Sequence, residues 1–332
     1  MPIFTRKVYY FMPDRTKLRV STRVMFDELL RQQANVRILD ASSSLLEYDD
    51  TSGESHVLFS TLSDKTSQAG TSVARDKNKG RFIAHRLGIP VPDDHMCLTV
   101  SDAFSLLEKY GRVVIKPLDC SGGAGVTTDI TTLAELRTAF SYAQSHSDNV
   151  MVQQHVSGSD IRLLVVAGTF RSAVERRPAT VKGDGISSIR KLIGIENSSQ
   201  NRSNDYMTNQ VTIDIASAER YLGDRIESVP LKNSTTIVVG PANLSLGGTA
   251  HEATHLVSSP MIHDAEKIAR RLGLAMCGVD MIWDEVTSEY YFIEVNANPG
   301  IDMHNDPFWG TATDAIERYV TWLLDPLAKM AY

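Results

Sequence analysis

The chain has 332 residues, of which 42% are hydrophobic and 22% are charged, as in ordinary soluble globular proteins. Its formal net charge of −6 gives no electrostatic reason to expect a nucleic acid or an anionic membrane as a partner. The three cysteines are widely spaced and form neither a disulfide framework nor a Cys-x-x-Cys metal site. No apolar run could serve as a signal peptide or membrane span, so we expect a cytoplasmic protein with a substantial core.

The first 72 residues predict a small β-α-β subdomain. Strand-like residues at 7–12 and 36–39 flank a helix over 21–33. The polar remainder of this subdomain shows little periodicity, apart from a strand at 57–60.

Residues 73–155 predict a second subdomain. The expected elements are helices over 72–87, 102–110 and 133–144 and strands over 112–116 and 150–155. Between them, the loop Cys-Ser-Gly-Gly-Ala-Gly at 120–125 follows Lys116. A glycine loop brings backbone N–H groups close to an anion and a lysine adds charge, so a phosphate site competes here with an ordinary glycine hairpin. The loop is not a Walker A motif.

Residues 156–332 predict a third subdomain. The expected elements are a strand over 161–166, helices over 188–195, 262–272 and 313–324, and a hairpin of the segments 277–283 and 290–296. Small-residue loops are expected at 157–160, 183–185 and 242–250.

The hairpin carries the strongest chemical signal. A register symmetric about Thr287 places Asp280 opposite Glu294, and Asn296 lies two residues further along the same face. Two facing carboxylates repel each other, so we expect a positive charge between them. Oxygen ligands suit a hard cation such as Mg²⁺, which one or two carboxylates usually hold together with phosphates and water. The alternative is that Asp280 merely ends the hairpin and Glu294 faces solvent.

A competing motif follows the last glycine loop. The residues His251-Glu252-Ala253-Thr254-His255 match the zinc-protease pattern His-Glu-x-x-His, which requires a helix to place both imidazoles on one metal. Two glycines before the motif and a proline after it disfavour that helix. The alternative is a polar loop that leads into the next helix.

Seven motifs occur in an order and spacing that resemble the ATP-grasp superfamily of carboxylate–amine ligases, with cyanophycin synthetase and bifunctional glutathione synthetase as the nearest members. They are Asp76-Lys77, Lys116-Pro117, Gly158–Arg162, Arg177-Pro178-Ala179 with Gly183-Asp184-Gly185, Asn243–Thr249, Gly278-Val279-Asp280, and Glu294–Gly300 with Met303-His304. The resemblance implies an α/β (α+β) ATP-grasp fold, with the small subdomain 1–72 followed by subdomains 73–155 and 156–332 that clamp ATP.

The resemblance also implies residue roles. For the nucleotide it implies phosphate contacts from Lys77 and Lys116, a lid of Ser121, Gly122, Gly123 and Gly125, an adenine hinge at Gln153, Gln154 and Val156, and a ribose contact from Asp160. For the metal it implies two Mg²⁺ ions, replaceable by Mn²⁺, on Asp280, Glu294 and Asn296. For the reaction it implies Arg177, Asn243, Gly247 and Gly248 near the transferred phosphate, with Arg162, Lys182 and His304 as substrate contacts.

This chain departs from the family pattern in three places. The family usually has glutamate where Gln153 stands, and the glycine loop lacks the Asn-His and Arg of the cyanophycin enzymes. The chain also has neither the Mur-ligase-like half nor the glutamate–cysteine ligase half of those larger enzymes. Their substrates therefore do not transfer directly to this chain.

We expect an enzyme in which a carboxylate attacks ATP to give an acyl phosphate, and an amine then displaces phosphate to form an amide. The substrates would be amino acids or small peptides, and the family suggests a homodimer or tetramer. His304 is a candidate base for the amine, or else a residue that fixes the loop after Gly300. The alternatives are transfer to a carrier protein, a non-catalytic ATP-binding regulatory module, and the zinc hydrolase.

Overall fold

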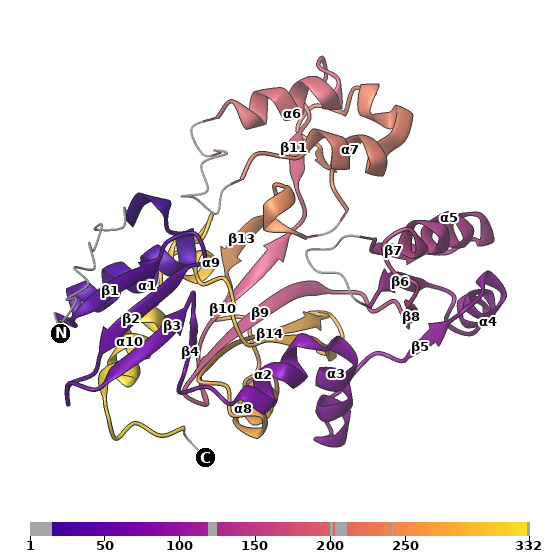
Figure 1. The fold of residues 1–332 in the computed structure, drawn as a ribbon. Helices are drawn as coiled ribbons and strands as arrows, with labels where there is room; N and C mark the ends of the chain where they lie inside the picture. Colours follow the sequence, from indigo (N-terminus) through magenta and orange to yellow (C-terminus); the bar gives the residue numbers. More distant parts are fainter. Residues whose placement is uncertain (1–14, 119–124, 200–201, 203–210, 241, 331–332) are drawn as a thin grey trace, which may run out of the picture.

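The computed structural model describes residues 15–118, 125–199, 202, 211–240 and 242–330. Within them lie three larger β-sheets, each with helices packed on it, and one two-stranded sheet (Figure 1). The strand expected at 7–12 lies outside the described residues. No described helix is long and apolar enough to cross a membrane.

The N-terminal sheet is an antiparallel meander. It contains β1 (Val36–Asp40), β2 (Leu45–Asp49), β3 (Ser55–Phe59) and β4 (Leu62–Ser63), preceded by η1 (Arg15–Lys17) and α1 (Val20–Arg31). Strands β2 and β4 were not predicted, because the segment is largely polar. The signal in β2 is the alternation that buries Leu46 and Tyr48 on either side of Glu47. The helix α10 (Ala315–Leu324), at the other end of the chain, completes this core with the buried ring of Tyr319.

The single helix predicted over 72–87 is wrong, because the structure has two helices, α2 (Gln68–Arg75) and α3 (Lys77–Arg86). Asp76 separates them with an extended backbone. Its carboxylate accepts hydrogen bonds from the N–H groups of Asn78 and Lys79 and so caps α3. This cap places Lys77 in the first turn of the helix.

The second sheet has the order β5 (Asp94–Cys97), β8 (Val150–Gln154), β6 (Val113–Pro117), β7 (Thr127–Ile130). One face packs on α4 (Val100–Tyr110) and α5 (Leu133–Gln144), which both begin with a capping box. Alternation then turns Lys116 and Gln153 to the opposite face. We call this opposite face the lysine face.

The third sheet is antiparallel, with the order β13 (Thr249–Glu252), β10 (Thr169–Arg177), β9 (Ser159–Val166), β14 (Met276–Trp283), β15 (Tyr290–Asn296). Strand β10 was not predicted from the sequence. Helix α8 (Ser259–Leu272) covers the apolar face, where Leu163 and Val279 are buried. The other face carries Asp280 and Glu294, and we call it the acidic face.

A smaller group of elements forms between β10 and β13. It comprises β11 (Thr180–Lys182), α6 (Ile189–Asn197), α7 (Ile215–Leu222), η2 (Gly223–Glu227) and β12 (Thr235–Ile237), and it projects from the end of the third sheet (Figure 1). The group has its own hydrophobic core around Leu192 and Ala218, which the three-subdomain prediction did not separate. The short helix η3 (Leu244–Leu246) lies in the loop before β13, and α9 (Asp302–Asn305) lies in the loop after β15.

Two helical glycines provide a test of this packing. A Cβ on Gly70 in α2 would overlap the carbonyl oxygen of Leu272 at the end of α8, whereas a Cβ on Gly194 in α6 would meet nothing. We expect Gly70→Ala to lower the free energy of unfolding by about 1–3 kcal/mol, because the helices must separate. We expect Gly194→Ala to raise it by about 0.5–1 kcal/mol.

Urea unfolding followed by circular dichroism measures both glycine variants. Equal stability of the two variants would contradict the close approach of α2 and α8.

Candidate active site

The hairpin of β14 and β15 forms, and its predicted register holds at the end away from the turn. Asp280 pairs with Glu294, and Asn296 pairs with Gly278 on the same face. A bulge after Asp280 shifts the register toward the turn, so that Ile282 faces Tyr291 rather than Phe292 as a symmetric hairpin requires. The three predicted metal residues therefore share one face.

Asp280 is held by two arginines. Its side chain is 1% exposed, and it accepts hydrogen bonds at 2.7 and 2.8 Å from Nε and Nη2 of Arg162. A third comes from Nη2 of Arg176 at 2.9 Å. Burial alone would raise the pKa of Asp280, but the two guanidinium groups hold that pKa well below its usual range. The positive charge expected between the carboxylates thus includes protein side chains.

Arg176 is the residue that the sequence analysis missed. It bridges Asp280 and Asp160, whose Oδ1 lies 2.6 Å from Nη2. The prediction named its neighbour Arg177 instead, without assigning a strand there. Once β10 is recognised, alternation alone separates Arg176 from Arg177 and assigns Arg176 to the acidic face.

The oxygen atoms that remain fit a hard cation. A carboxylate offers about four acceptor positions, and three hydrogen bonds reach Asp280. Glu294 is 29% exposed, and its Oε2 lies 3.6 Å from Nζ of Lys77. The Asn296 oxygen accepts one hydrogen bond, from the N–H of Asn298. Two carboxylates with spare capacity and an amide oxygen match the ligands that Mg²⁺ takes when phosphates and water complete its shell.

The lysine face supplies a buried cation. Nζ of Lys116 donates to Oε1 of Gln153 at 2.9 Å, and both side chains are buried. Burial, together with the nearby charges of Arg81 and Lys77, lowers the pKa of Lys116 to about 7, while Glu294 opposes that shift. The charges of Lys77 on α3 and Glu294 on β15 therefore both act on Lys116 of β6.

The other predicted nucleotide residues lie around this region, as far as the structure describes them. Gln154 and Val156 are half-buried, and the Gln154 N–H donates to the carbonyl of Asp93. Gly125 has a φ of 72° and lies close to Pro117, so a side chain there would be strained. Ser121, Gly122 and Gly123 lie outside the described residues.

The residues predicted near the transferred phosphate gather at the end of β10 and β13. Gly247 has a φ of 94°, and the backbone of Gly248 closely approaches the carbonyl oxygens of Arg177 and Asn243. Neither glycine leaves room for a larger residue. The side chain of Arg177, however, points to the face opposite Asp280 and pairs with Glu175 at 2.6 Å.

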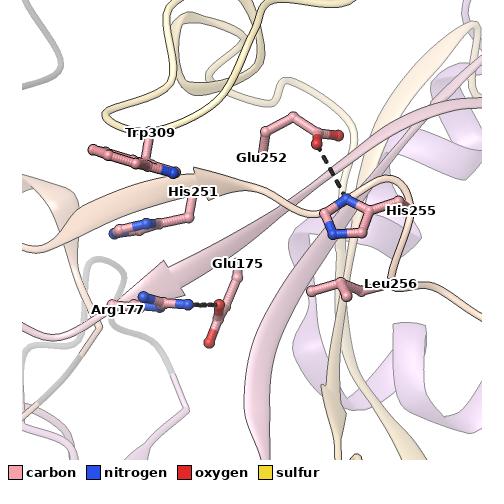
Figure 2. A pocket seen from close by; sticks show the side chains of 7 residues that line it. All are labelled: Glu175, Arg177, His251, Glu252, His255, Leu256 and Trp309. Carbon is pink, nitrogen blue, oxygen red and sulfur yellow. Dashed lines mark hydrogen bonds and ion pairs between the residues drawn. The ribbon is translucent and has the colours of Figure 1, made fainter.

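On that opposite face, Arg177 lines a pocket of 320 Å³ together with His251, His255 and Trp309 (Figure 2). The helix that zinc binding requires does not form: His251 and Glu252 lie on β13, and His255 lies in the turn after it. Nε2 of His251 and Oγ1 of Thr249 are 2.9 Å apart. These positions overturn the zinc-protease alternative.

The remaining predicted substrate residues have different surroundings. His304 is buried, its Nδ1 lies 2.8 Å from Oγ of Ser172, and burial followed by the charge of Arg162 lowers its pKa to about 3. This contact with Ser172 connects the loop after Gly300 to β10, as the second of the two roles expected for His304 requires. Lys182 is exposed on β11.

Comparison with known proteins identifies the family. Residues 82–213 match the family described as prokaryotic glutathione synthetase, ATP-grasp domain, and residues 241–317 match the RimK-like ATP-grasp domain. The chain belongs to the ATP-grasp superfamily. The predicted α/β ATP-grasp fold is thereby confirmed.

Relatives of this ATP-grasp chain are longer than it is. Cyanophycin synthetase of Trichormus variabilis is 33% identical over 261 residues, which cover 75% of this chain and 29% of the relative. The bifunctional glutathione biosynthesis protein of Listeria innocua is 23% identical over 97% of this chain and 43% of the relative. The bifunctional glutathione synthetase of Pasteurella multocida shares the fold with a TM-score of 0.68 at 21% identity, over 94% of this chain and 44% of that one. The chain thus spans less than half the length of these relatives.

Removal of Asp280 and removal of Glu294 should lower the free energy of unfolding by different amounts. We expect Asp280→Ala to lower the free energy of unfolding by about 3–5 kcal/mol, because it removes the carboxylate partner of the buried Arg162 and one of the two partners of Arg176. We expect Glu294→Ala to cost less than about 1 kcal/mol, because Glu294 is partly exposed and its ion pair is long. Urea unfolding measures both variants, and similar losses would contradict the arginine pairing.

The pKa of Lys116 predicts a pH dependence. As pH rises through about 7, Lys116 loses its proton, so the affinity for Mg-ATP should fall between pH 6 and 8 by up to about tenfold. Binding near pH 7.5 should take up a proton, which calorimetry in two buffers of different ionisation enthalpy detects. Gln153→Glu is the control: its carboxylate raises the pKa of Lys116 and should remove the fall. A pH-independent affinity in the wild type would contradict the assignment.

Proposed function

We propose that this chain is an ATP-dependent carboxylate–amine ligase that releases ADP and forms an amide bond through an acyl phosphate. The observation that carries the proposal is the meeting of two polar sheet faces. Lys116 lies on one, Asp280 and Glu294 lie on the other, and Lys77 pairs with Glu294. ATP-grasp ligases in general use ATP and Mg²⁺, and these residues have the charges that such ligands need.

Phosphoryl transfer depends mainly on positioning and on neutralising phosphoryl oxygens. In the proposed site Lys77 and Lys116 bind the phosphates, and Asp160 binds the ribose. Asp280, Glu294 and Asn296 would hold magnesium, which supplies charge neutralisation at the β- and γ-phosphates. Arg162 and Arg176 fix the Asp280 carboxylate, so that its remaining acceptor position is directed before the nucleotide arrives.

The acyl donor would lie near the end of β10 and the glycine loop before β13. Asn243, Gly247 and Gly248 would lie near the transferred phosphate, although the N–H groups of the two glycines already donate to the carbonyls of Leu244 and Asn243. Arg162 uses Nε and Nη2 on Asp280, which leaves Nη1 for a substrate carboxylate. Arg177 would have to turn around the strand end to join them, and His304 would hold the loop rather than act as the base.

Relatives named for cyanophycin and glutathione synthesis suggest amino acids or small peptides as substrates. Five features stay predictions: two magnesium ions, their replacement by Mn²⁺, a homodimer or tetramer, a cytoplasmic location, and the subdomain boundaries at 72 and 155. Analytical ultracentrifugation and metal titration would test the first three.

ADP release tests the proposal. With Mg-ATP and pooled amino acids and small peptides, we expect the wild type to release ADP only when the pool is present. The rate of ADP release should fall at least about a hundredfold in Glu294→Ala, because magnesium would lose one of its protein ligands. Glu285→Ala removes an exposed carboxylate from the turn of the same hairpin and should keep full activity. Tight ATP binding without turnover would indicate a carrier-dependent or regulatory protein. Absence of ATP binding would contradict the proposal.

A further inference from the structure

The hairpin of β2 and β3 in the N-terminal sheet brings three metal-ligating side chains together. Asp50 follows β2, Glu54 precedes β3, and His56 lies on β3. One ligand atom from each residue lies within 4.8 Å of the other two. The turn that carries them is anchored to the rest of the molecule, because the N–H of Thr51 donates to the carbonyl of Leu324 at the end of α10. The cluster belongs to neither the lysine face nor the acidic face.

The imidazole of His56 lies between two carboxylates. Its Nδ1 lies 3.2 Å from Oδ2 of Asp64, and its Nε2 lies 3.4 Å from Oδ2 of Asp50. A neutral imidazole carries a single N–H and can donate to only one of these oxygens. The other nitrogen directs its lone pair at a carboxylate, and these two atoms repel each other unless a cation lies between them.

The geometry favours a metal ion over a second proton as this cation. N–H···O hydrogen bonds usually measure about 2.7–3.2 Å between the heavy atoms, and the distance of 3.4 Å from Nε2 to Asp50 is longer. Two ligand atoms that each lie about 2.0–2.1 Å from a tetrahedral zinc ion are about 3.4 Å apart. Glu54 adds a second carboxylate, which a divalent ion uses and a proton does not.

The groups around the three ligands fix their directions. A metal-binding histidine usually donates its other N–H to a carboxylate, and Asp64 is the acceptor for Nδ1 of His56. The N–H groups of Ser52 and Glu54 both donate to Oδ1 of Asp50, which leaves Oδ2 for an ion. The Asp50 side chain is only 1% exposed, but Glu54 is exposed and provides the route to solvent.

A buried hydroxyl beside the cluster lacks an acceptor. Tyr48 is 0% exposed, its ring stacks on that of His56 with centroids 5.3 Å apart, and its hydroxyl has no partner among the described residues. Burial, followed by the nearby Asp64, Tyr319 and Asp50, raises the pKa of this hydroxyl well above its usual range, so it lies near both carboxylates. Buried donors normally find an acceptor, and water on a bound ion is one that this position offers.

We propose that Asp50, Glu54 and His56 bind one Zn²⁺ ion, with water in the fourth position. One imidazole and two carboxylates suit zinc better than magnesium, which takes oxygen ligands. The ion would close the turn between β2 and β3 and so stabilise the N-terminal sheet. The inference is independent of the proposed function, because no residue of the cluster takes part in the candidate active site.

Calorimetric titration of the metal-free full chain with Zn²⁺, in a background of excess Mg²⁺, tests this inference. We expect one zinc site per chain, and Glu54→Gln should weaken zinc binding at least about tenfold. Glu54 is exposed, so this variant should fold normally. His255→Ala is the matched control: it removes an exposed histidine from the His-Glu-x-x-His motif and should leave the dissociation constant unchanged.

Thermal unfolding gives a second readout. Zinc should raise the midpoint of unfolding in the wild type and in His255→Ala, but by a smaller amount in Glu54→Gln at the same zinc concentration. Absence of zinc binding in the wild type would overturn the inference. Binding that survives Glu54→Gln and is lost in His255→Ala would overturn it as well, and both results would leave the proposed ligase function intact.

Discussion

The candidate site depends on how the chain keeps Asp280 charged inside the protein. An isolated buried carboxylate would take up a proton, because the low dielectric of the interior disfavours its charge. Arg162 on the adjacent strand and Arg176 one strand further both reach Asp280, and Arg176 continues to Asp160. The order of the third sheet is what brings β14, β9 and β10 side by side. The same network that stabilises the charge also fixes the direction of the carboxylate in the proposed metal site.

The candidate site also requires a cationic surface opposite the acidic face. The lysine face provides it, since α4 and α5 cover the apolar side of the second sheet and leave Lys116 on the other side. Helix α3 joins the two sheets: Arg81 pairs with Asp94 on β5, and Lys77 pairs with Glu294 on β15. The Asp76 cap that starts α3 therefore sets the position of Lys77 as well as the helix boundary.

Much of this site could be predicted from the sequence because its determinants are local. The opposition of Asp280 and Glu294 follows from a short hairpin and the alternation of a strand, and the loop glycines were visible as motifs. The features that could not be predicted depend on contacts between residues that are distant in the sequence. Arg176 lies 104 residues from its partner Asp280, and no local sequence pattern predicts that pair. The buried contact between Gln153 and Lys116, 37 residues apart, is another pair of this kind.

In the proposed complex the nucleotide lies between the lysine face and the acidic face. Hydrogen–deuterium exchange with a non-hydrolysable Mg-ATP analogue tests that location directly. We expect slower exchange in both sheets at once, in peptides covering β6 and β8 and in those covering β14 and β15. Protection confined to one sheet, or centred on the pocket of Arg177, His251 and Trp309, would contradict it.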